Sequence, residues 1–206
     1  MLFKTNDRIL FIGDSITDAG RLVDPEGIGQ GYVRLIRDYF YKDLSDLNLK
    51  VINKGVSGNR VTDLASRWNE DVIKLNPNWV SVSIGINDVW RQIDQPTMEQ
   101  VYPKKFEEIY TRLLTELSEE TQSQIILMEP TVIVEDRQSE GNQKLIPYVE
   151  IVRKLAKVFN AILIPTHRVF IEHLAGMSSE ILTKDGVHMN NAGNKLLADT
   201  WLAAVK

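Results

Sequence analysis

Arg8-Ile-Leu-Phe-Ile-Gly-Asp-Ser-Ile-Thr17 is the stretch around which the fold is organised. Its apolar residues 9–12, closed by Gly13, are typical of a fully buried strand. The strand stops at Asp14-Ser15, which places a hydroxyl at its carboxyl end. In open α/β sheets, ligands bind at that edge. A serine after a strand is by default only a helix cap, so other parts of the chain must decide its role.

Strands and helices alternate along the whole chain. Apolar runs at residues 49–53, 79–84, 124–128 and 161–164 predict four further strands, and residues at helical spacing lie between them. This alternation predicts an α/β fold, a three-layer α/β/α sandwich around a five-stranded parallel sheet. Right-handed crossovers leave few topologies, of which we expect the flavodoxin-like order 2-1-3-4-5. No repeat or linker divides residues 1–206, so we expect one domain.

The composition limits which classes of partner and which cellular compartment we expect. A net charge of −4 argues against a nucleic-acid partner, because such domains usually carry a basic stripe. No apolar run approaches the length of a membrane span, and the first eight residues hold no apolar signal segment. We therefore expect a cytoplasmic protein with no membrane partner. Without cysteine there is no disulfide, thiolate metal site or cysteine nucleophile.

Four polar clusters carry the candidate chemistry. Three follow predicted strands, at residues 14–15, 57–59 and 87–88, and the fourth precedes the last predicted helix, at residues 185–188. Because parallel strands place their carboxyl ends on one edge, the first three clusters should converge. A serine nucleophile needs a base within reach, a group that orients the base, and donors for the developing oxyanion.

These clusters can supply each of those parts. Ser15 can be the nucleophile and His188 the base, and Asp185 can turn back to hold the imidazole tautomer. The backbone N–H groups of Ser15 and Gly58, with the carboxamide of Asn87, can donate to the oxyanion. The residues alone therefore favour acyl transfer through a serine.

The same clusters resemble the four blocks of the SGNH (GDSL-type) hydrolases. They stand in that family's order and at its spacing, across nearly the whole chain. The blocks read Gly13-Asp-Ser-Ile16, Gly55-Val-Ser-Gly58, Gly85-Ile-Asn-Asp88 and Asp185-Gly-Val-His188. Three longer segments resemble one branch of the family more closely, at residues 11–18, 53–59 and 84–92. That branch is the intracellular bacterial acetyl xylan esterases, which deacetylate xylo-oligosaccharides.

The resemblance implies a single SGNH hydrolase domain over residues 1–206. It implies a serine esterase that removes small acyl groups, above all acetyl, from a carbohydrate such as an acetylated xylo-oligosaccharide through an acyl-enzyme intermediate. The roles that it implies are nucleophile for Ser15, oxyanion donors for Ser15, Gly58 and Asn87, and the acid–base pair for Asp185 and His188. One position departs from the family, because Met189 stands where proline often follows the histidine. We expect the histidine to keep its place with a different local turn.

Four residues beside these blocks are weaker candidates for substrate contact: Asp14, Asn59, Trp90 and Arg91. Turn and capping bonds explain Asp14, like Asp88, more simply. A packed edge residue and a surface charge explain Trp90 and Arg91 equally well. Polar, aperiodic residues 129–143 are the best candidate for a mobile loop over the site.

No cofactor and no metal are expected. The glycines at 27, 29 and 31 are too closely spaced for a dinucleotide fingerprint and follow no strand. Asp14, Asp18, Asp185 and His188 could assemble a hard-metal site, but their spacing matches no recognised metal motif. Two alternatives stay open: a lysophospholipase- or thioesterase-type acylhydrolase with the same site, and a noncatalytic flavodoxin-like binding module. A homo-oligomer is also left open.

Overall fold

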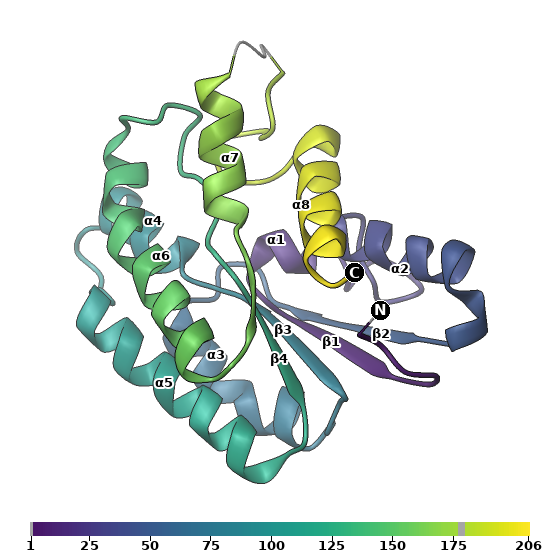
Figure 1. The fold of residues 1–206 in the computed structure, drawn as a ribbon. Coiled ribbons are helices and arrows are strands. Elements are labelled where there is room, and N and C mark those ends of the chain that lie inside the picture. The colour runs from purple at the N-terminus through teal and green to yellow at the C-terminus, as the bar shows by residue number, and fades with distance from the viewer. Residues whose placement is uncertain (1, 177–179) are drawn as a thin grey trace.

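A twisted parallel sheet lies at the centre of the computed structural model, which describes residues 2–176 and 180–206 (Figure 1). Its strands stand in the order β2-β1-β3-β4-β5, and every neighbouring pair is parallel. This confirms the predicted fold class and strand order. The strands are β1 Arg8–Gly13, β2 Lys50–Gly55, β3 Trp79–Ser83, β4 Gln124–Met128 and β5 Ile162–Ile164.

Helices cover both faces of this sheet (Figure 1). On one face α2 (Tyr32–Asp43) packs against α8 (Asn191–Ala204). On the other, α5 (Pro103–Glu120) packs against both α3 (Val61–Trp68) and α6 (Glu140–Val158). The shorter helical elements are α1 (Ser15–Asp18), α4 (Ile86–Asp94), α7 (Thr166–Ala175), a 3₁₀ turn at Ser45–Leu47 and a π turn at Asn69–Ile73.

The central strands end at a common level, and this places the candidate site. Gly13 pairs with Gly55 of β2 and with Ser83 of β3. A Cβ on Gly13 would lie 2.2 Å from the Ser83 carbonyl oxygen, so only glycine allows this approach at the end of β1. The residues that follow β1, β2 and β3 therefore emerge side by side at the carboxyl edge.

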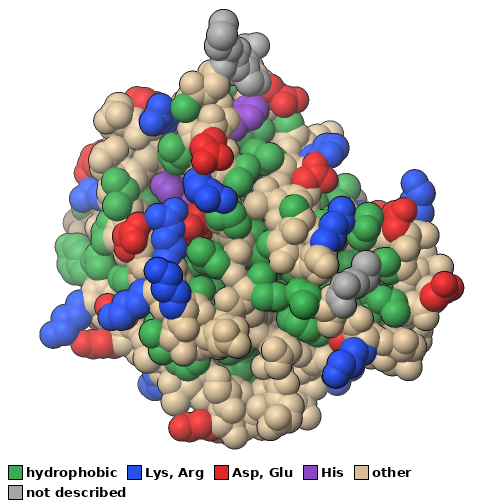
Figure 2. Space-filling model, in the orientation of Figure 1, with side chains coloured by type: hydrophobic (Ala, Val, Ile, Leu, Met, Phe, Trp, Pro, Cys, Tyr) green, Lys and Arg blue, Asp and Glu red, His purple; other side chains and the backbone are tan. Residues whose placement is uncertain are grey.

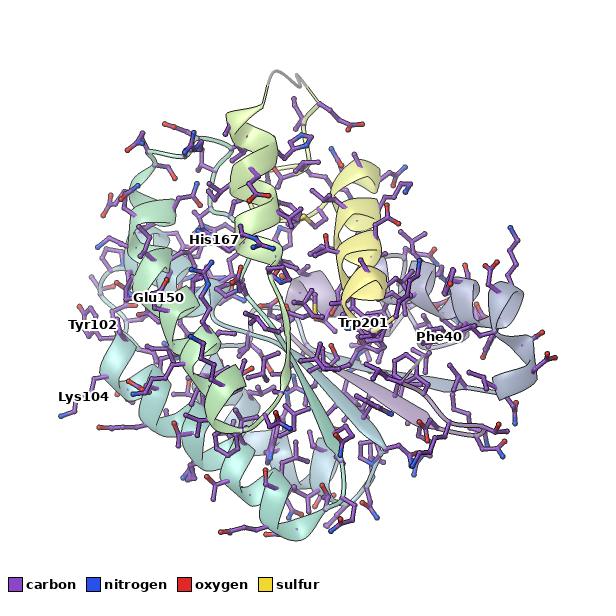
Figure 3. All side chains as sticks on the ribbon, in the orientation of Figure 1. Phe40, Tyr102, Lys104, Glu150, His167 and Trp201 are labelled. Carbon is purple, nitrogen blue, oxygen red and sulfur yellow. The ribbon has the colours of Figure 1, made fainter. Side chains whose placement is uncertain are left out.

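An aromatic cluster joins α2 and α8 to the sheet. Trp201 of α8 and Phe40 of α2 point toward one another (Figure 3), with ring centroids 6.0 Å apart. The Trp201 indole donates to Ser81 Oγ of β3 over 3.0 Å, which satisfies its one polar atom in the core. Trp68 and Trp79 are also buried.

Two elements differ from the sequence-based expectation. Residues 86–94 form helix α4, although the expected site residues there gave no helical period. Helix α6 begins at Glu140, inside the predicted loop, because Ser139 Oγ accepts the Asn142 N–H and caps it. The residue spacing also predicts short helical structure over 169–182. Helix α7 covers its first part, to Ala175, and residues 177–179 lie outside the described residues.

The surface carries charges of both signs. On the face shown in Figure 2, Lys and Arg side chains are interspersed with Asp and Glu side chains. Among residues 2–176 and 180–206, no helix is both long enough and apolar enough to cross a membrane.

Candidate active site

A cleft of about 400 Å³ opens beside the end of β1. Ser15 and His188 both line it, although 173 positions separate them in the sequence. The rest of the wall is mixed: it includes the polar residues Gln30, Ser57, Lys184 and Asn194 and the apolar residues Ile16, Ala19 and Met189. The structure thus brings the first and the last of the predicted clusters to one cavity.

Ser15 is presented by the turn between β1 and α1. Asp14 is the N-cap of α1, and its Oδ1 accepts the Ile16 N–H over 3.0 Å. Ser15 is therefore the first helical residue, and its Oγ lies 2.9 Å from His188 Nε2. A serine hydroxyl at this distance can pass its proton directly to the imidazole.

His188 and Asp185 form one hydrogen-bonded unit on the loop before α8. Asp185 Oδ2 lies 2.7 Å from His188 Nδ1. The other carboxylate oxygen accepts the backbone N–H groups of His188 and Val187, over 2.8 and 3.1 Å. The carboxylate is thereby fixed at both oxygens, and it holds the ring with the Nδ1 proton toward itself and Nε2 toward Ser15.

These bonds also set the charge of Asp185. Burial raises the pKa of its carboxyl, but the hydrogen bonds from the His188 ring and from the two backbone N–H groups outweigh it and lower the pKa to about 2. Asp185 is therefore a carboxylate throughout the neutral range, where it can stabilise a charged imidazole.

Two candidate oxyanion donors come from the neighbouring strand ends. Gly58 has a φ of +82°, and apart from its chain neighbours no atom of the described residues lies within 4 Å of where its Cβ would be, so its backbone faces open space. The Asn87 carboxamide donates one N–H to the Asn59 carbonyl oxygen over 3.1 Å. An amide nitrogen carries two hydrogens, and among the described residues none accepts the second, so this buried side chain keeps one N–H that can donate to a ligand.

Sequence comparison decides the family. Residues 11–196 match the GDSL-like lipase/acylhydrolase family. The chain belongs to this family. It is therefore a carboxylic ester hydrolase.

Relatives of this GDSL-type hydrolase share its full length. An acetylxylan esterase of Geobacillus stearothermophilus is 38% identical, over 100% of this chain and 96% of the relative. The crystal structure of that organism's acetylxylan esterase Axe2 matches with a TM-score of 0.92 at 37% identity, over 100% of this chain and 96% of that one. Further Axe2 structures are of catalytic mutants, in which a serine, an aspartate or a histidine is replaced by alanine.

A second solved structure is similarly close. LAE5, an α/β hydrolase from the metagenome of Lake Arreo in Spain, matches with a TM-score of 0.92 at 33% identity, over 100% of this chain and 97% of that one.

The weaker candidates of this GDSL-type hydrolase take different places. Asp14 is only 1% exposed and caps α1, which argues against its predicted substrate contact. The Asn59 side chain accepts the Arg67 Nε–H over 2.7 Å, so its amide oxygen is already used. The Trp90 ring packs edge-on to His188 with centroids 5.7 Å apart, and the Arg91 guanidinium lies 4.9 Å from the Trp90 centroid. Trp90 therefore packs against the base and Arg91 against Trp90, and neither is among the residues that line the cleft.

Arg67 is a site residue that sequence reasoning missed. Beyond its bond to Asn59, its guanidinium donates to the carbonyl oxygens of Gly13 and Lys54, over 2.9 and 2.7 Å. It thus ties the ends of β1 and β2 to the loop that carries Gly58. Arg67 lies at a position of α3 that the helical spacing assigns to the surface, so the sequence alone gives no sign of this role.

The other two histidines lie outside the cleft. His167, on the first turn of α7 (Figure 3), is buried and bonds through Nδ1 to the Thr131 carbonyl oxygen over 2.5 Å. His173 bonds to the Glu180 carbonyl oxygen. Neither ring contacts Ser15 or Asp185 among the hydrogen bonds of the described residues; both instead join backbone segments outside the cleft. In the described part of the chain, no group of three or more His, Asp or Glu side chains is placed to hold a metal ion.

Two buried carboxyl groups, Asp14 and Asp88, lie next to the site residues Ser15 and Asn87 in the sequence. Burial raises the pKa of Asp88 to about 8, against the opposing hydrogen bond from the Val61 N–H. Burial likewise raises the pKa of Asp14 to about 7, against the bond from the Ile16 N–H. Both groups are therefore protonated in the folded enzyme at pH values where a solvated aspartate has lost its proton.

Their linkage to folding gives a prediction. Between about pH 5 and pH 8 these two carboxyl groups hold more protons in the folded state than in the unfolded chain, so their contribution to the free energy of unfolding should fall as the pH rises. Asp88→Asn keeps an oxygen acceptor for Val61 but does not ionise. Between pH 5 and pH 8 the free energy of unfolding of Asp88→Asn should therefore fall less than that of the wild type, by on the order of 2–3 kcal/mol.

Urea unfolding at the two pH values measures this difference directly. Asp136→Asn, at an exposed aspartate, controls for the loss of one negative charge. Parallel pH profiles for Asp88→Asn and the wild type would contradict the linkage.

Proposed function

We propose that this ester hydrolase is an acetyl esterase that acts on acetylated xylo-oligosaccharides through an acetyl-serine intermediate. The observation that carries the proposal is the continuous hydrogen-bonded line from Ser15 through His188 to Asp185 at one cleft. The acetylxylan esterase with catalytic serine, aspartate and histidine mutants supports it. In that enzyme the aspartate and the histidine stand three positions apart, as Asp185 and His188 do here.

The geometry suits a two-step acyl transfer. Ser15 Oγ attacks the carbonyl carbon of the ester while its proton passes to His188 Nε2, and Asp185 stabilises the imidazolium. The tetrahedral intermediate then collapses, the bond from the carbonyl carbon to the sugar oxygen breaks, and that oxygen takes the proton from His188. Water attacks the acetyl-serine by the same route, which releases acetate and restores Ser15.

The oxyanion of each intermediate would accept from the backbone N–H groups of Ser15 and Gly58 and from the free N–H of Asn87. Asn87→Ala should therefore lower kcat by about 10²–10³-fold. KM should move little, because this bond strengthens mainly as charge develops on the carbonyl oxygen. Steady-state kinetics with p-nitrophenyl acetate measure both values. A normal kcat with a raised KM would instead make Asn87 a residue for ground-state binding.

The polar side chains of the cleft favour a sugar over a fatty acyl chain. Gln30 and Ser57 line it: the Gln30 amide can donate and accept, and the Ser57 hydroxyl, which donates to Asp18, can still accept from a sugar hydroxyl. We expect kcat/KM to be higher for p-nitrophenyl acetate than for the octanoate, and acetate to be released from acetylated xylo-oligosaccharides. A kcat/KM that rises steadily from acetyl to octanoyl would favour the lysophospholipase- or thioesterase-type alternative. No turnover of any ester would favour the binding module.

A further inference from the structure

The loop that carries Asp185 and His188 has little regular structure of its own. It is closed by an isolated antiparallel bridge between Thr183 and Met189, with the Lys184 N–H donating to the His188 carbonyl oxygen over 2.7 Å. Strand and helix ladders therefore do not fix the loop, and its position depends on contacts from elsewhere.

Glu135, on the segment between β4 and α6, supplies such contacts. Its two carboxylate oxygens accept the Leu182 N–H over 3.0 and 3.2 Å, and Oε1 also accepts the Thr183 N–H over 2.6 Å. The Thr183 hydroxyl donates to the same oxygen and in turn accepts the Gly186 N–H over 3.2 Å. One carboxylate thus binds the entry of the loop and reaches, through Thr183, the residue between Asp185 and Val187.

The backbone beside Glu135 is itself held in place. Val134 has a φ of +66°, which is rare for a β-branched residue and persists only where the surroundings impose it. Its N–H donates to the Gly186 carbonyl oxygen over 2.8 Å. The buried Asn142 side chain fixes the same turn, because it accepts the Ile133 N–H and donates to the Val134 carbonyl oxygen, over 2.8 and 3.0 Å.

We propose that Glu135 is a positioning residue, whose carboxylate sets the loop of Asp185 and His188 at the distance from Ser15 that acyl transfer needs. This inference rests on the proposed function and deepens it. Glu135 acts through the loop, since its bonds go to Leu182 and Thr183. On this proposal, residues 129–143, which the sequence predicts as a mobile loop over the site, instead hold the loop of Asp185 and His188 in position.

Glu135→Ala should lower kcat for p-nitrophenyl acetate by about 10²-fold, because a displacement of about 1 Å in a catalytic group has an effect of that size. KM should stay within about threefold, since the cleft wall is unchanged. Glu135→Gln keeps one oxygen acceptor and should recover part of the rate. Asp136→Ala is the matched control, because within the described residues this neighbouring carboxylate accepts only the Gln138 N–H of its own turn.

Thr183→Val tests the route of the effect. If Glu135 acts through the Thr183 hydroxyl, the double variant Glu135→Ala/Thr183→Val should be no slower than Glu135→Ala alone. Proton NMR adds a readout that does not need turnover, namely the far-downfield signal of the His188 Nδ1 proton in its bond to Asp185. That signal should broaden or disappear in Glu135→Ala and persist in Asp136→Ala, with thermal unfolding confirming that both variants are folded.

Three results would overturn the proposal: kcat within about twofold of the wild type in both Glu135 variants, an equal loss in Asp136→Ala, or an unchanged downfield signal in Glu135→Ala. Should Glu135→Ala not fold, Glu135→Gln carries the same comparison. A wild-type enzyme that hydrolyses no ester would count against the proposed function, whereas the NMR comparison would still decide whether Glu135 positions the loop.

Discussion

Alanine in place of Ser15 is expected to lower kcat for p-nitrophenyl acetate by about 10⁴–10⁶-fold. The substitution removes the only oxygen that lies 2.9 Å from His188 Nε2 among the described residues, so no acyl-enzyme can form. Residual rate would come from the oxyanion donors and from binding alone. KM should change little, because the hydroxyl contributes mainly to the transition state.

Mass spectrometry of the intact protein checks this independently of rates. An organophosphonate that labels serine nucleophiles should add one group to the wild type, at Ser15, and none to Ser15→Ala. Ser66→Ala is the matched control, because the exposed Ser66 hydroxyl bonds, within the described chain, only to the Asp63 carbonyl oxygen on its own helix. Labelling at another residue, or a Ser15→Ala enzyme with more than a few per cent of the wild-type kcat, would disprove the nucleophile assignment.

Loss of the imidazole should be nearly as severe. We expect His188→Ala to lower kcat by about 10⁴–10⁶-fold, because without a base the Ser15 hydroxyl keeps its proton and remains a weak nucleophile. Asp185→Asn should be milder than Ser15→Ala, because it spoils the orientation and charge support of an imidazole that is still present.

The control for His188→Ala is His173→Ala, which removes a histidine that bonds to a carbonyl oxygen outside the cleft. Circular dichroism establishes that all variants are folded. A His188→Ala enzyme that retained a tenth of the wild-type kcat would show that another group serves as the base. Asp185→Asn slower than Ser15→Ala would contradict the assigned order of roles.

Prediction from the sequence succeeded where the pattern is local. An apolar run closed by glycine marks β1, and the alternation of elements indicated the strand order that the structure shows. The four polar clusters were recognisable because each is a short, contiguous sequence motif whose residue types suit a specific chemistry. Because the central strands end at the same edge of the sheet, the motifs that follow them lie close together.

The parts that were missed depend on contacts without a local pattern. Glu135 binds backbone N–H groups 47 and 48 positions away, and such a bond places no constraint on residue type at Leu182. Helix α4 was missed because Asn87 and Asp88, in its first buried turn, look like loop residues until their polar atoms are seen to be satisfied. The capping role of Asp14 was weighed correctly, but its burial depends on α1 packing across the sheet edge.

The 173 positions between Ser15 and His188 have a consequence for biosynthesis. On the ribosome, the nucleophile emerges with the first strand, whereas its base follows only after β5 and α7. A nascent or truncated chain that lacks the loop before α8 would hold an unactivated serine and could not acylate itself. Esterase activity would therefore report that the chain has been synthesised and folded through that loop.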